Sequence, residues 1–165
     1  EYNVRTQECK SALDSIQVKY PEYNFLCDIP VEIIKEFKTN LSFNEYKRAV
    51  FASEENQRTL KAVDFLKDGD VVQLGNLLYS SHEGLRDLYE VSCKELDFLV
   101  EFTRNIFSVK GARMMGGGFG GCTLNIVKED YADQFINDIS EAYLKKFNIK
   151  LTPHMVKTNN GVRVL

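Results

Sequence analysis

The sequence predicts an α+β fold in which helices pack on an antiparallel β-sheet. Apolar residues recur at helical spacing through the first two thirds of the chain. Six of the ten glycines then fall between residues 111 and 121, and a short apolar segment follows them. This order of helices, strand, glycine-rich turn, strand and helix indicates a layer of helices that covers an antiparallel sheet.

Helices are predicted before residue 108, because apolar residues recur every three or four positions in this part of the chain. Pro21 stops the first helix, since proline lacks the amide hydrogen that would continue it. Ser42 and Asp70 are residue types that cap helix N-termini, and each precedes an apolar stripe. The predicted helices and stripes cover residues 3–19, 30–37, 43–66, 74–88 and 96–107.

The long predicted helix over residues 43–66 combines an apolar face with a polar centre. The centre, Glu54–Arg58, is polar all round, which is typical of a solvated face or of a surface that meets another domain. Elsewhere on this helix the apolar spacing places a further set of residues on one face. These residues are Tyr46, Ala49, Val50, Ser53, Leu60 and Val63.

The remainder of the chain supplies the predicted sheet. Residues 112–115 are short and apolar, and Cys122–Val127 is a strand by composition and length. A helix is predicted over residues 131–147, where apolar residues again follow helical spacing. Two closing strands are predicted over residues 153–157 and 162–165, around a turn at residues 159–161.

Length and composition fit a single globular domain over residues 1–165. Hydrophobic residues make up 44% of the chain and charged residues 27%, values that exclude a disordered or low-complexity protein. No run of residues approaches the roughly 18 apolar positions that a membrane-spanning helix requires. The formal net charge of −3 gives no basic surface, so neither nucleic acid nor a membrane is expected as a partner.

The cysteines and histidines predict no metal site. The four cysteines are widely spaced and form no Cys-x-x-Cys pair, and only His82 and His154 are available to join them. Scattered cysteines in a domain with a sufficient core are typical of reduced, buried thiols in a cytoplasmic protein. His82, beside an apolar stripe, is expected to be a hydrogen-bonded structural residue. The cysteines are Cys9, Cys27, Cys93 and Cys122.

The segment Gly116–Gly121 is the strongest functional signal in the sequence. Consecutive glycines permit positive φ angles and close approach of the backbone to another group. Successive amides in such a turn form a concave nest that suits phosphate, and a tight hairpin that binds nothing fits the composition equally well. A dinucleotide-binding loop would open a helix, whereas a strand follows here. A Walker A loop would need a Gly-Lys-Ser/Thr sequence, which this segment lacks.

Four segments in the same order over nearly the whole chain resemble the GHMP family of small-molecule kinases and, within it, the galactokinases. The glycine-rich segment over residues 111–123 is similar to the third motif of that family. The other segments are similar to the start of the galactokinase C-terminal half and to two later blocks. They lie within Tyr2–Cys9, Ser53–Arg58 and Ser81–Asp97.

The resemblance implies a two-domain enzyme that transfers the γ-phosphoryl group of ATP, with Mg²⁺, to the anomeric hydroxyl of D-galactose. The main phosphate loop of the family, its catalytic Asp and a partner Arg belong to an N-terminal domain that is absent from this sequence. We therefore assign no catalytic residue and no metal ligand, expect no tightly bound cofactor, and predict that the chain alone is inactive. The start at Glu1, without an initiator Met, is likewise expected of a piece of a longer polypeptide.

The resemblance also implies roles for individual residues. Tyr2 matches a family tyrosine that contacts the sugar, the alternative being a chain-end tyrosine without a role. Gly116, Gly117 and Gly118 are expected either to border the nucleotide phosphates or to brace the phosphate loop of the absent domain. Phe119 is expected to anchor the turn by packing rather than to touch a ligand.

Three further positions carry expectations of their own. Arg5 and Arg58 are expected by default to be solvated surface residues, with acidic groups of another domain as the alternative partners. Met115 departs from the family, which usually has threonine at this position, so the hydrogen bonding of the turn is expected to differ.

Alternatives to a galactokinase remain open at this point. One alternative is a related sugar kinase that acts on N-acetylgalactosamine or arabinose. It stays open because the absent domain sets most of the sugar choice. A galactokinase-like sensor would bind galactose and ATP without catalysis, and a free-standing interaction domain would bind neither. If the chain is part of a galactokinase, galactose and ATP bind through the missing N-terminal domain. The exposed interdomain face is then expected to be apolar enough for a dimer.

Overall fold

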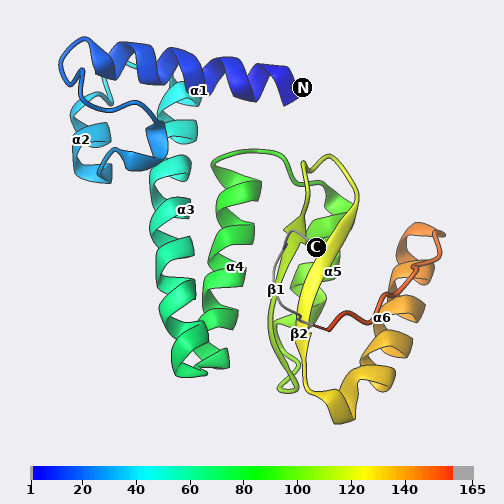
Figure 1. Cartoon of the computed structure of the whole chain (residues 1–165). Helices are drawn as coiled ribbons and strands as arrows, with labels where there is room; N and C mark the ends of the chain where they lie inside the picture. Colours follow the sequence, from blue (N-terminus) through cyan, green and yellow to red (C-terminus); the bar gives the residue numbers. More distant parts are fainter. Residues whose placement is uncertain (1, 158–165) are drawn as a thin grey trace, which may run out of the picture.

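The computed structural model describes residues 2–157 and places helices around a two-stranded antiparallel sheet (Figure 1). Helices precede and follow the sheet, which confirms the predicted α+β class. The elements are α1 (Tyr2–Gln17), η1 (Leu26–Asp28), α2 (Val31–Glu36), α3 (Phe43–Asp68), α4 (Val71–Asp87), α5 (Lys94–Thr103), β1 (Val109–Met115), β2 (Cys122–Val127), η2 (Glu129–Tyr131) and α6 (Ala132–Phe147).

Both predicted helix caps are confirmed. At the start of α3, the Ser42 hydroxyl accepts from the Glu45 N–H at 3.3 Å, and the Glu45 carboxylate accepts from the Ser42 N–H at 2.8 Å. At the start of α4, the Asp70 carboxylate accepts from the Gln73 N–H at 3.0 Å. These bonds satisfy amides that the helices leave free at their first turns, so side-chain chemistry fixes where both helices begin.

The helix α4 lies directly against the backbone of β1. A Cβ atom on Gly75 would meet the carbonyl oxygen of Lys110 at 1.8 Å, and one on Gly111 would meet the Cα atom of Gly75 at 2.4 Å. Glycine at both positions therefore lets a helix and a strand approach more closely than side chains permit. Figure 1 shows the long antiparallel pair of α3 and α4 on one side of the hairpin and α6 on the other.

The hairpin positions the glycine-rich turn. Strands β1 and β2 pair in antiparallel register from Gly111 opposite Ile126 to Met115 opposite Cys122. The segment Gly116–Gly121, called the glycine turn below, therefore closes the hairpin at one end of the molecule. The two-stranded sheet depends on packing for its stability, because an isolated hairpin is only marginally stable in water.

Apolar side chains form three clusters within the described residues. The first joins α1, η1, α2 and the N-terminal half of α3, and the second joins α3, α4, α5 and β1. The third joins α5, β1 and α6. Their buried members include Ala12, Ile16, Ile34 and Ala49 in the first cluster, Phe51, Leu85, Leu96 and Met114 in the second, and Leu99, Val109, Phe135 and Ile139 in the third.

The C-terminal half of α3 departs from the predicted apolar face. Ala49 is fully buried, but Leu60 is 55% exposed and Val63 is 44% exposed. The N-terminal half of α3 packs on α1, η1 and α2, whereas its C-terminal half extends beyond them beside α4 (Figure 1). Leu66 and Val72 are also exposed near the turn that joins α3 to α4, so apolar side chains gather at this end.

The predicted strand over residues 153–157 is wrong. These residues adopt no regular secondary structure and are exposed to solvent. Pro153 has no backbone N–H to offer a neighbouring strand, and no strand within residues 2–157 pairs with the segment. The predicted strand over residues 162–165 and the turn at residues 159–161 lie outside the described residues. None of the helices within residues 2–157 combines the length and apolar composition of a membrane span.

The expectation of buried cysteines is wrong, although all four thiols are free. Cys9, Cys27 and Cys93 are half-buried, and Cys122 is exposed. Cys122 opens β2 beside the glycine turn. Its partner across the hairpin, Met115, is 49% exposed, so this end of the hairpin faces solvent instead of the core.

Candidate functional site

Three segments that are far apart in the sequence meet at one end of the molecule (Figure 1). They are the start of α1, the glycine turn, and the α4–α5 connection, which comprises residues 88–93. Hydrogen bonds run from α1 to the connection and from the glycine turn to the connection. The structure therefore brings Tyr2 and the glycines of the turn, singled out from the sequence, to either side of one shared neighbour.

The glycine turn has one open side and one fixed side. A Cβ atom on Gly116 or Gly117 would meet nothing within 4 Å, so the backbone is accessible there. A Cβ atom on Gly118, whose φ is +83°, would lie only 2.2 Å from the carbonyl oxygen of Val91. Phe119 donates its backbone N–H to the same oxygen at 2.7 Å. The anchor of the turn is this backbone bond instead of the expected phenyl packing, because the Phe119 side chain is 41% exposed.

Arg5 fixes the start of α1 to the connection. Its Nε donates to the carbonyl oxygen of Tyr89 at 2.8 Å, and its Nη2 donates to that of Glu90 at 3.0 Å. The expectation of a solvated Arg5 is wrong, because these partners lie within its own chain and leave its side chain only 15% exposed. Tyr2 lies one helical turn earlier and is 60% exposed. Arg5 therefore holds the part of α1 that carries Tyr2 against the connection.

Tyr89 lines the connection on the side that faces α1. The Cys9 thiol donates to the Tyr89 hydroxyl at 3.8 Å, and the Tyr89 ring stacks on Phe51 with 5.0 Å between ring centroids. Burial raises the pKa of Tyr89 to about 12, and the nearby Cys9 and Tyr2 side chains act in the same direction. Tyr89 therefore remains a neutral hydroxyl at physiological pH, close to Tyr2.

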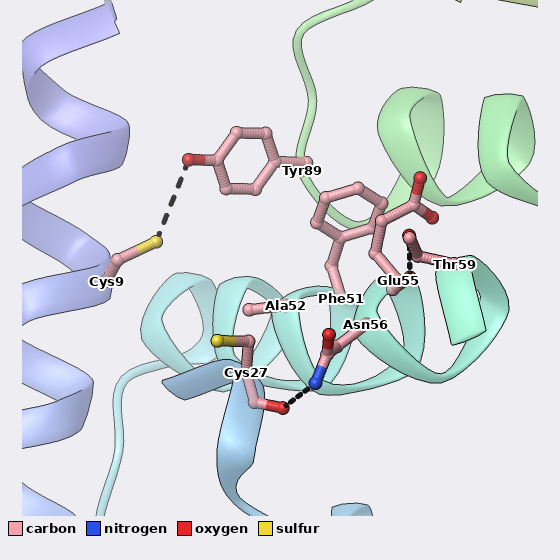
Figure 2. A pocket seen from close by; sticks show the side chains of 8 residues that line it. All are labelled: Cys9, Cys27, Phe51, Ala52, Glu55, Asn56, Thr59 and Tyr89. Atoms are coloured by element: carbon pink, nitrogen blue, oxygen red, sulfur yellow. Dashed lines mark hydrogen bonds between the residues drawn. The ribbon is translucent and has the colours of Figure 1, made fainter. Parts of the chain in front are cut away.

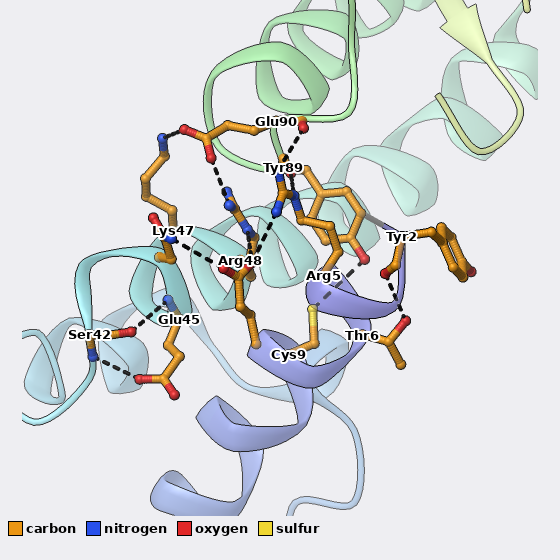
Figure 3. Close-up of polar contacts among 12 residues, drawn as sticks. Tyr2, Arg5, Thr6, Cys9, Ser42, Glu45, Lys47, Arg48, Tyr89 and Glu90 are labelled. Atoms are coloured by element: carbon orange, nitrogen blue, oxygen red, sulfur yellow. Dashed lines mark hydrogen bonds and ion pairs between the residues drawn. The ribbon is translucent and has the colours of Figure 1, made fainter. Parts of the chain in front are cut away.

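A charged cluster ties the connection to α1 and α3 (Figure 3). Arg48 is fully buried and donates to the carboxylates of Glu8 at 2.8 Å and Glu90 at 2.7 Å, and to the carbonyl oxygen of Leu88. Lys47 also donates to the Glu90 carboxylate. Hydrogen bonds from Lys47 and Arg48 hold the pKa of Glu90 at about 2. One buried guanidinium thus joins three segments, as Arg can with its planar set of donors.

His82 links the base of the glycine turn to the same connection. His82 is 1% exposed, and its Nδ1 accepts from the backbone N–H of Met114 at 3.2 Å. The proton of the neutral ring therefore lies on Nε2, which is 3.2 Å from Oδ1 of Asp97. Asp97 in turn accepts from the Ser92 hydroxyl at 2.5 Å. Burial lowers the pKa of His82, with Asp97 opposing the shift, and the predicted structural role is confirmed.

The polar centre of α3 is covered in part: Glu55 and Arg58 are engaged within the protein, whereas Gln57 faces solvent. The Glu55 carboxylate accepts from Arg58 at 2.8 Å, from Arg113 at 3.1 Å, and from the Ser81 hydroxyl. Arg58 also donates to Glu54 at 3.3 Å and is only 16% exposed, so the expectation of a solvated Arg58 is wrong. These contacts join α3 to α4 and β1.

An open hollow of about 360 Å³ lies between α1, η1 and α3 (Figure 2). Its polar side chains are already engaged: Asn56 donates to the carbonyl oxygen of Cys27 at 2.9 Å, and Glu55 belongs to the cluster around Arg58. The lining of the hollow is therefore mainly apolar and leaves few polar groups free to bind a ligand. Its lining residues are Cys9, Cys27, Phe51, Ala52, Glu55, Asn56, Thr59 and Tyr89.

The sequence did not mark the connection as the centre of the site. Glu90 has a φ of 55°, yet no glycine or asparagine signals a left-handed residue there. Arg48 stands in a helical stretch whose partners Glu8 and Glu90 are 40 and 42 residues away. The available signal was the block of similarity that includes Glu90, and it carried no information on these contacts.

Comparison with known proteins gives a consistent result. Residues 62–145 match the family described as GHMP kinases C terminal. The galactokinase of Thermotoga petrophila is 44% identical over 163 residues, which cover 99% of this chain and 44% of that protein. The galactokinase of Clostridium beijerinckii is 43% identical over 164 residues, which cover 99% of this chain and 42% of that protein. The chain therefore spans less than half the length of the curated relatives it matches.

A solved structure is similar over most of the chain. The crystal structure of Lactococcus lactis galactokinase complexed with galactose superposes with a TM-score of 0.85 at 33% sequence identity. The match covers 90% of this chain and 38% of that chain. Similarity in sequence and in fold thus extends over nearly the same residues.

Proposed function

The chain belongs to the GHMP kinase family, and we propose that it is the C-terminal part of a galactokinase that phosphorylates D-galactose with ATP. The observation that carries this proposal is the similarity to proteins named galactokinase over 99% of the chain. Because the chain covers 44% of such a relative, we further propose that an N-terminal ATP-binding and catalytic domain completes the enzyme. Residues 1–165 are then its C-terminal domain.

We propose that Tyr2 contacts the sugar and that the glycine turn either borders the nucleotide phosphates or braces the phosphate loop of the other domain. The hydroxyl of Tyr2 both donates and accepts hydrogen bonds, and its side chain is exposed at the start of α1. Gly116 and Gly117 leave the backbone open on one side of the turn, and Gly118 is seated on Val91 on the other. An exposed glycine backbone of this kind suits either the phosphates of ATP or the phosphate loop of the other domain.

The proposed reaction forms a bond between the anomeric oxygen of galactose and the γ-phosphorus of ATP. The bond from that phosphorus to the ADP oxygen breaks, and the hydroxyl proton passes to a base in the N-terminal domain. Within residues 2–157, no three His, Cys, Asp or Glu side chains gather in a way that would hold a metal ion. We propose that the protein ligands of Mg²⁺, which offsets phosphate charge, belong to the N-terminal domain. The proposed role of this chain is to hold the two substrates in the orientation that the reaction requires.

We propose a cytoplasmic location and a dimer of the chain as further properties. The four cysteines are free, and a reducing compartment keeps thiols in that state. Without its partner domain, the chain would expose its apolar interdomain face, on which two copies would pack. Light scattering over a range of concentrations tests the dimer, and a monomer throughout that range would exclude it.

The proposed function is tested by ATP turnover with galactose, N-acetylgalactosamine and arabinose. The chain alone is compared with the polypeptide that includes its native upstream sequence. Turnover by the longer polypeptide only, with a preference for galactose, is the expected result. Robust galactose-dependent turnover by the chain alone would contradict the proposed division between domains. Binding of galactose and ATP without turnover in either form would favour a sensor.

A further inference from the structure

The α4–α5 connection contacts both sides of the proposed site. Arg5, one helical turn after Tyr2, donates to the carbonyl oxygen of Glu90 at 3.0 Å. The next carbonyl oxygen along the chain, that of Val91, accepts from Phe119 of the glycine turn at 2.7 Å. Glu90 therefore stands between a contact to the sugar side and a contact to the phosphate side.

The backbone of Glu90 adopts a conformation that its residue type rarely takes. Its φ of 55° is left-handed, where the Cβ of any residue but glycine crowds the following carbonyl. Contacts to both ends of the residue hold this conformation: the carboxylate accepts from Lys47 and from Arg48, and the carbonyl oxygen accepts from Arg5. Backbone strain that is held in this way concentrates at functional sites.

Arg48 makes the charge of Glu90 important to the connection. Its guanidinium is fully buried and bonded to Glu8 of α1 and to the carbonyl oxygen of Leu88, as well as to Glu90. A buried cation that loses an anionic partner is strongly disfavoured. A neutral side chain at position 90 would therefore weaken one of the two contacts by which Arg48 holds the connection, and leave the contact to the carbonyl oxygen of Leu88.

We propose that Glu90 is a positioning residue for phosphoryl transfer, which holds the connection against Arg48 and so sets the separation between Tyr2 and the glycine turn. This inference rests on the proposed function. Glu90 acts through Arg5 on one side and through the carbonyl oxygen of Val91 on the other. A displacement of about 1 Å in such an arrangement lowers a reaction rate on the order of 100-fold.

The first test is hydrogen exchange at the Phe119 amide, measured by NMR in the 165-residue chain. Glu90→Gln removes the charge but keeps the size, and it is expected to speed this exchange by about tenfold or more. Glu90→Asp keeps the charge and tolerates a left-handed backbone, so it is expected to retain most of the protection. Glu36→Gln is the matched control, because Glu36 also accepts from a lysine, Lys19, in an exposed pair away from the connection.

The pattern of exchange separates positioning from a general loss of stability. A variant that is destabilised throughout would also speed exchange at core amides, such as that of Leu99 in α5. Faster exchange at Phe119 with unchanged exchange at Leu99 is the expected result for Glu90→Gln. Unchanged exchange at Phe119 in that variant would overturn the proposal.

The second test is the steady-state kinetics of the complete enzyme. Glu90→Gln is expected to raise KM for both galactose and ATP and to lower kcat by about tenfold or more, with Glu90→Asp in between. Glu36→Gln is expected to match the wild type. A change in KM for one substrate alone would overturn the proposal. If the wild-type enzyme does not turn over galactose, the proposed function fails, while the exchange experiment still decides the role of Glu90.

Discussion

The backbone N–H of Phe119 donates to the carbonyl oxygen of Val91 at 2.7 Å, and this bond joins the glycine turn to the α4–α5 connection. Gly118 packs on the same oxygen, so two adjacent residues of the turn contact one backbone atom of the connection. On the opposite side, Gly116 and Gly117 meet nothing within 4 Å. A turn held along one edge keeps a fixed position and still exposes Gly116 and Gly117 to solvent.

Gly118→Ala is expected to destabilise the protein by about 1–3 kcal/mol. Its Cβ would lie 2.2 Å from the carbonyl oxygen of Val91, at a φ of +83° that alanine rarely adopts. Urea unfolding measures the loss of stability. Gly117→Ala is the control within the same turn, since nothing lies within 4 Å of its Cβ, and a change within about 0.5 kcal/mol is expected. Equal unfolding midpoints for the two variants would contradict the close contact of Gly118 with Val91.

Arg48→Met is expected to lower the free energy of unfolding by about 3 kcal/mol or more. The variant keeps the length of the side chain but leaves Glu8 and Glu90 without their shared buried partner. Chemical unfolding followed by circular dichroism measures the loss. Arg86→Met provides the comparison, because Arg86 is 38% exposed and pairs with its neighbour Asp87, for which a cost within about 1 kcal/mol is expected. A similar small cost for both variants would contradict the role of Arg48.

His82 is expected to make the protein less stable as the pH falls below about 6.5. Burial lowers the pKa of His82 in the folded protein, so below pH 6.5 the unfolded chain binds a proton that the folded chain does not. Stability is therefore full above the unfolded pKa and declines as the pH falls toward the folded pKa, by at most about 1.4 kcal/mol per pH unit. Thermal unfolding between pH 7.5 and pH 5 measures this slope.

Two variants assign that slope to His82. His82→Asn removes the titrating group but keeps an acceptor for the Met114 N–H, and its stability is expected to vary less with pH. His154→Gln removes the other histidine of the chain, which is exposed, and it is expected to keep the wild-type slope. A slope that survives in His82→Asn would mean that another group carries it.

Cys122 is expected to react first with a limiting amount of N-ethylmaleimide. It is the exposed cysteine of the four, while burial raises the pKa of both the Cys9 and Cys27 thiols and so reduces their thiolate fraction. Peptide mapping by mass spectrometry identifies the labelled residue. Cys122→Ser should remove the fast phase of labelling, and a fast phase that remains in this variant would contradict the observed exposure.

Local chemistry allowed much of the fold to be predicted. Ser42 and Asp70 marked the starts of α3 and α4, because a helix cap depends on residues within one turn. The strand Cys122–Val127 was predicted with its observed bounds, because glycines precede it and its composition favours a strand. The predicted apolar face of α3 is correct only in the part of the helix that packs on neighbouring elements. Beyond that part, Leu60 and Val63 are exposed.

The arrangement of the candidate site depends on contacts that local sequence does not encode. Arg5 bonds to residues 84 and 85 positions away, so its default assignment to the solvent failed. Glu90 takes a left-handed backbone without any residue-type signal, because Arg48 and Lys47 hold its carboxylate. The residues themselves were recognisable from family resemblance, but which of them touch is decided by packing.

Gly75 and Gly111 restrict how sequences with this fold can diverge. A mutation at either position places a methyl group in space that the opposite backbone already occupies. A second mutation at the partner position enlarges the overlap instead of relieving it. Gly75 and Gly111 therefore cannot change as a compensating pair, as many contacting residues do over evolutionary time. Divergence at this crossing therefore requires α4 to move away from β1.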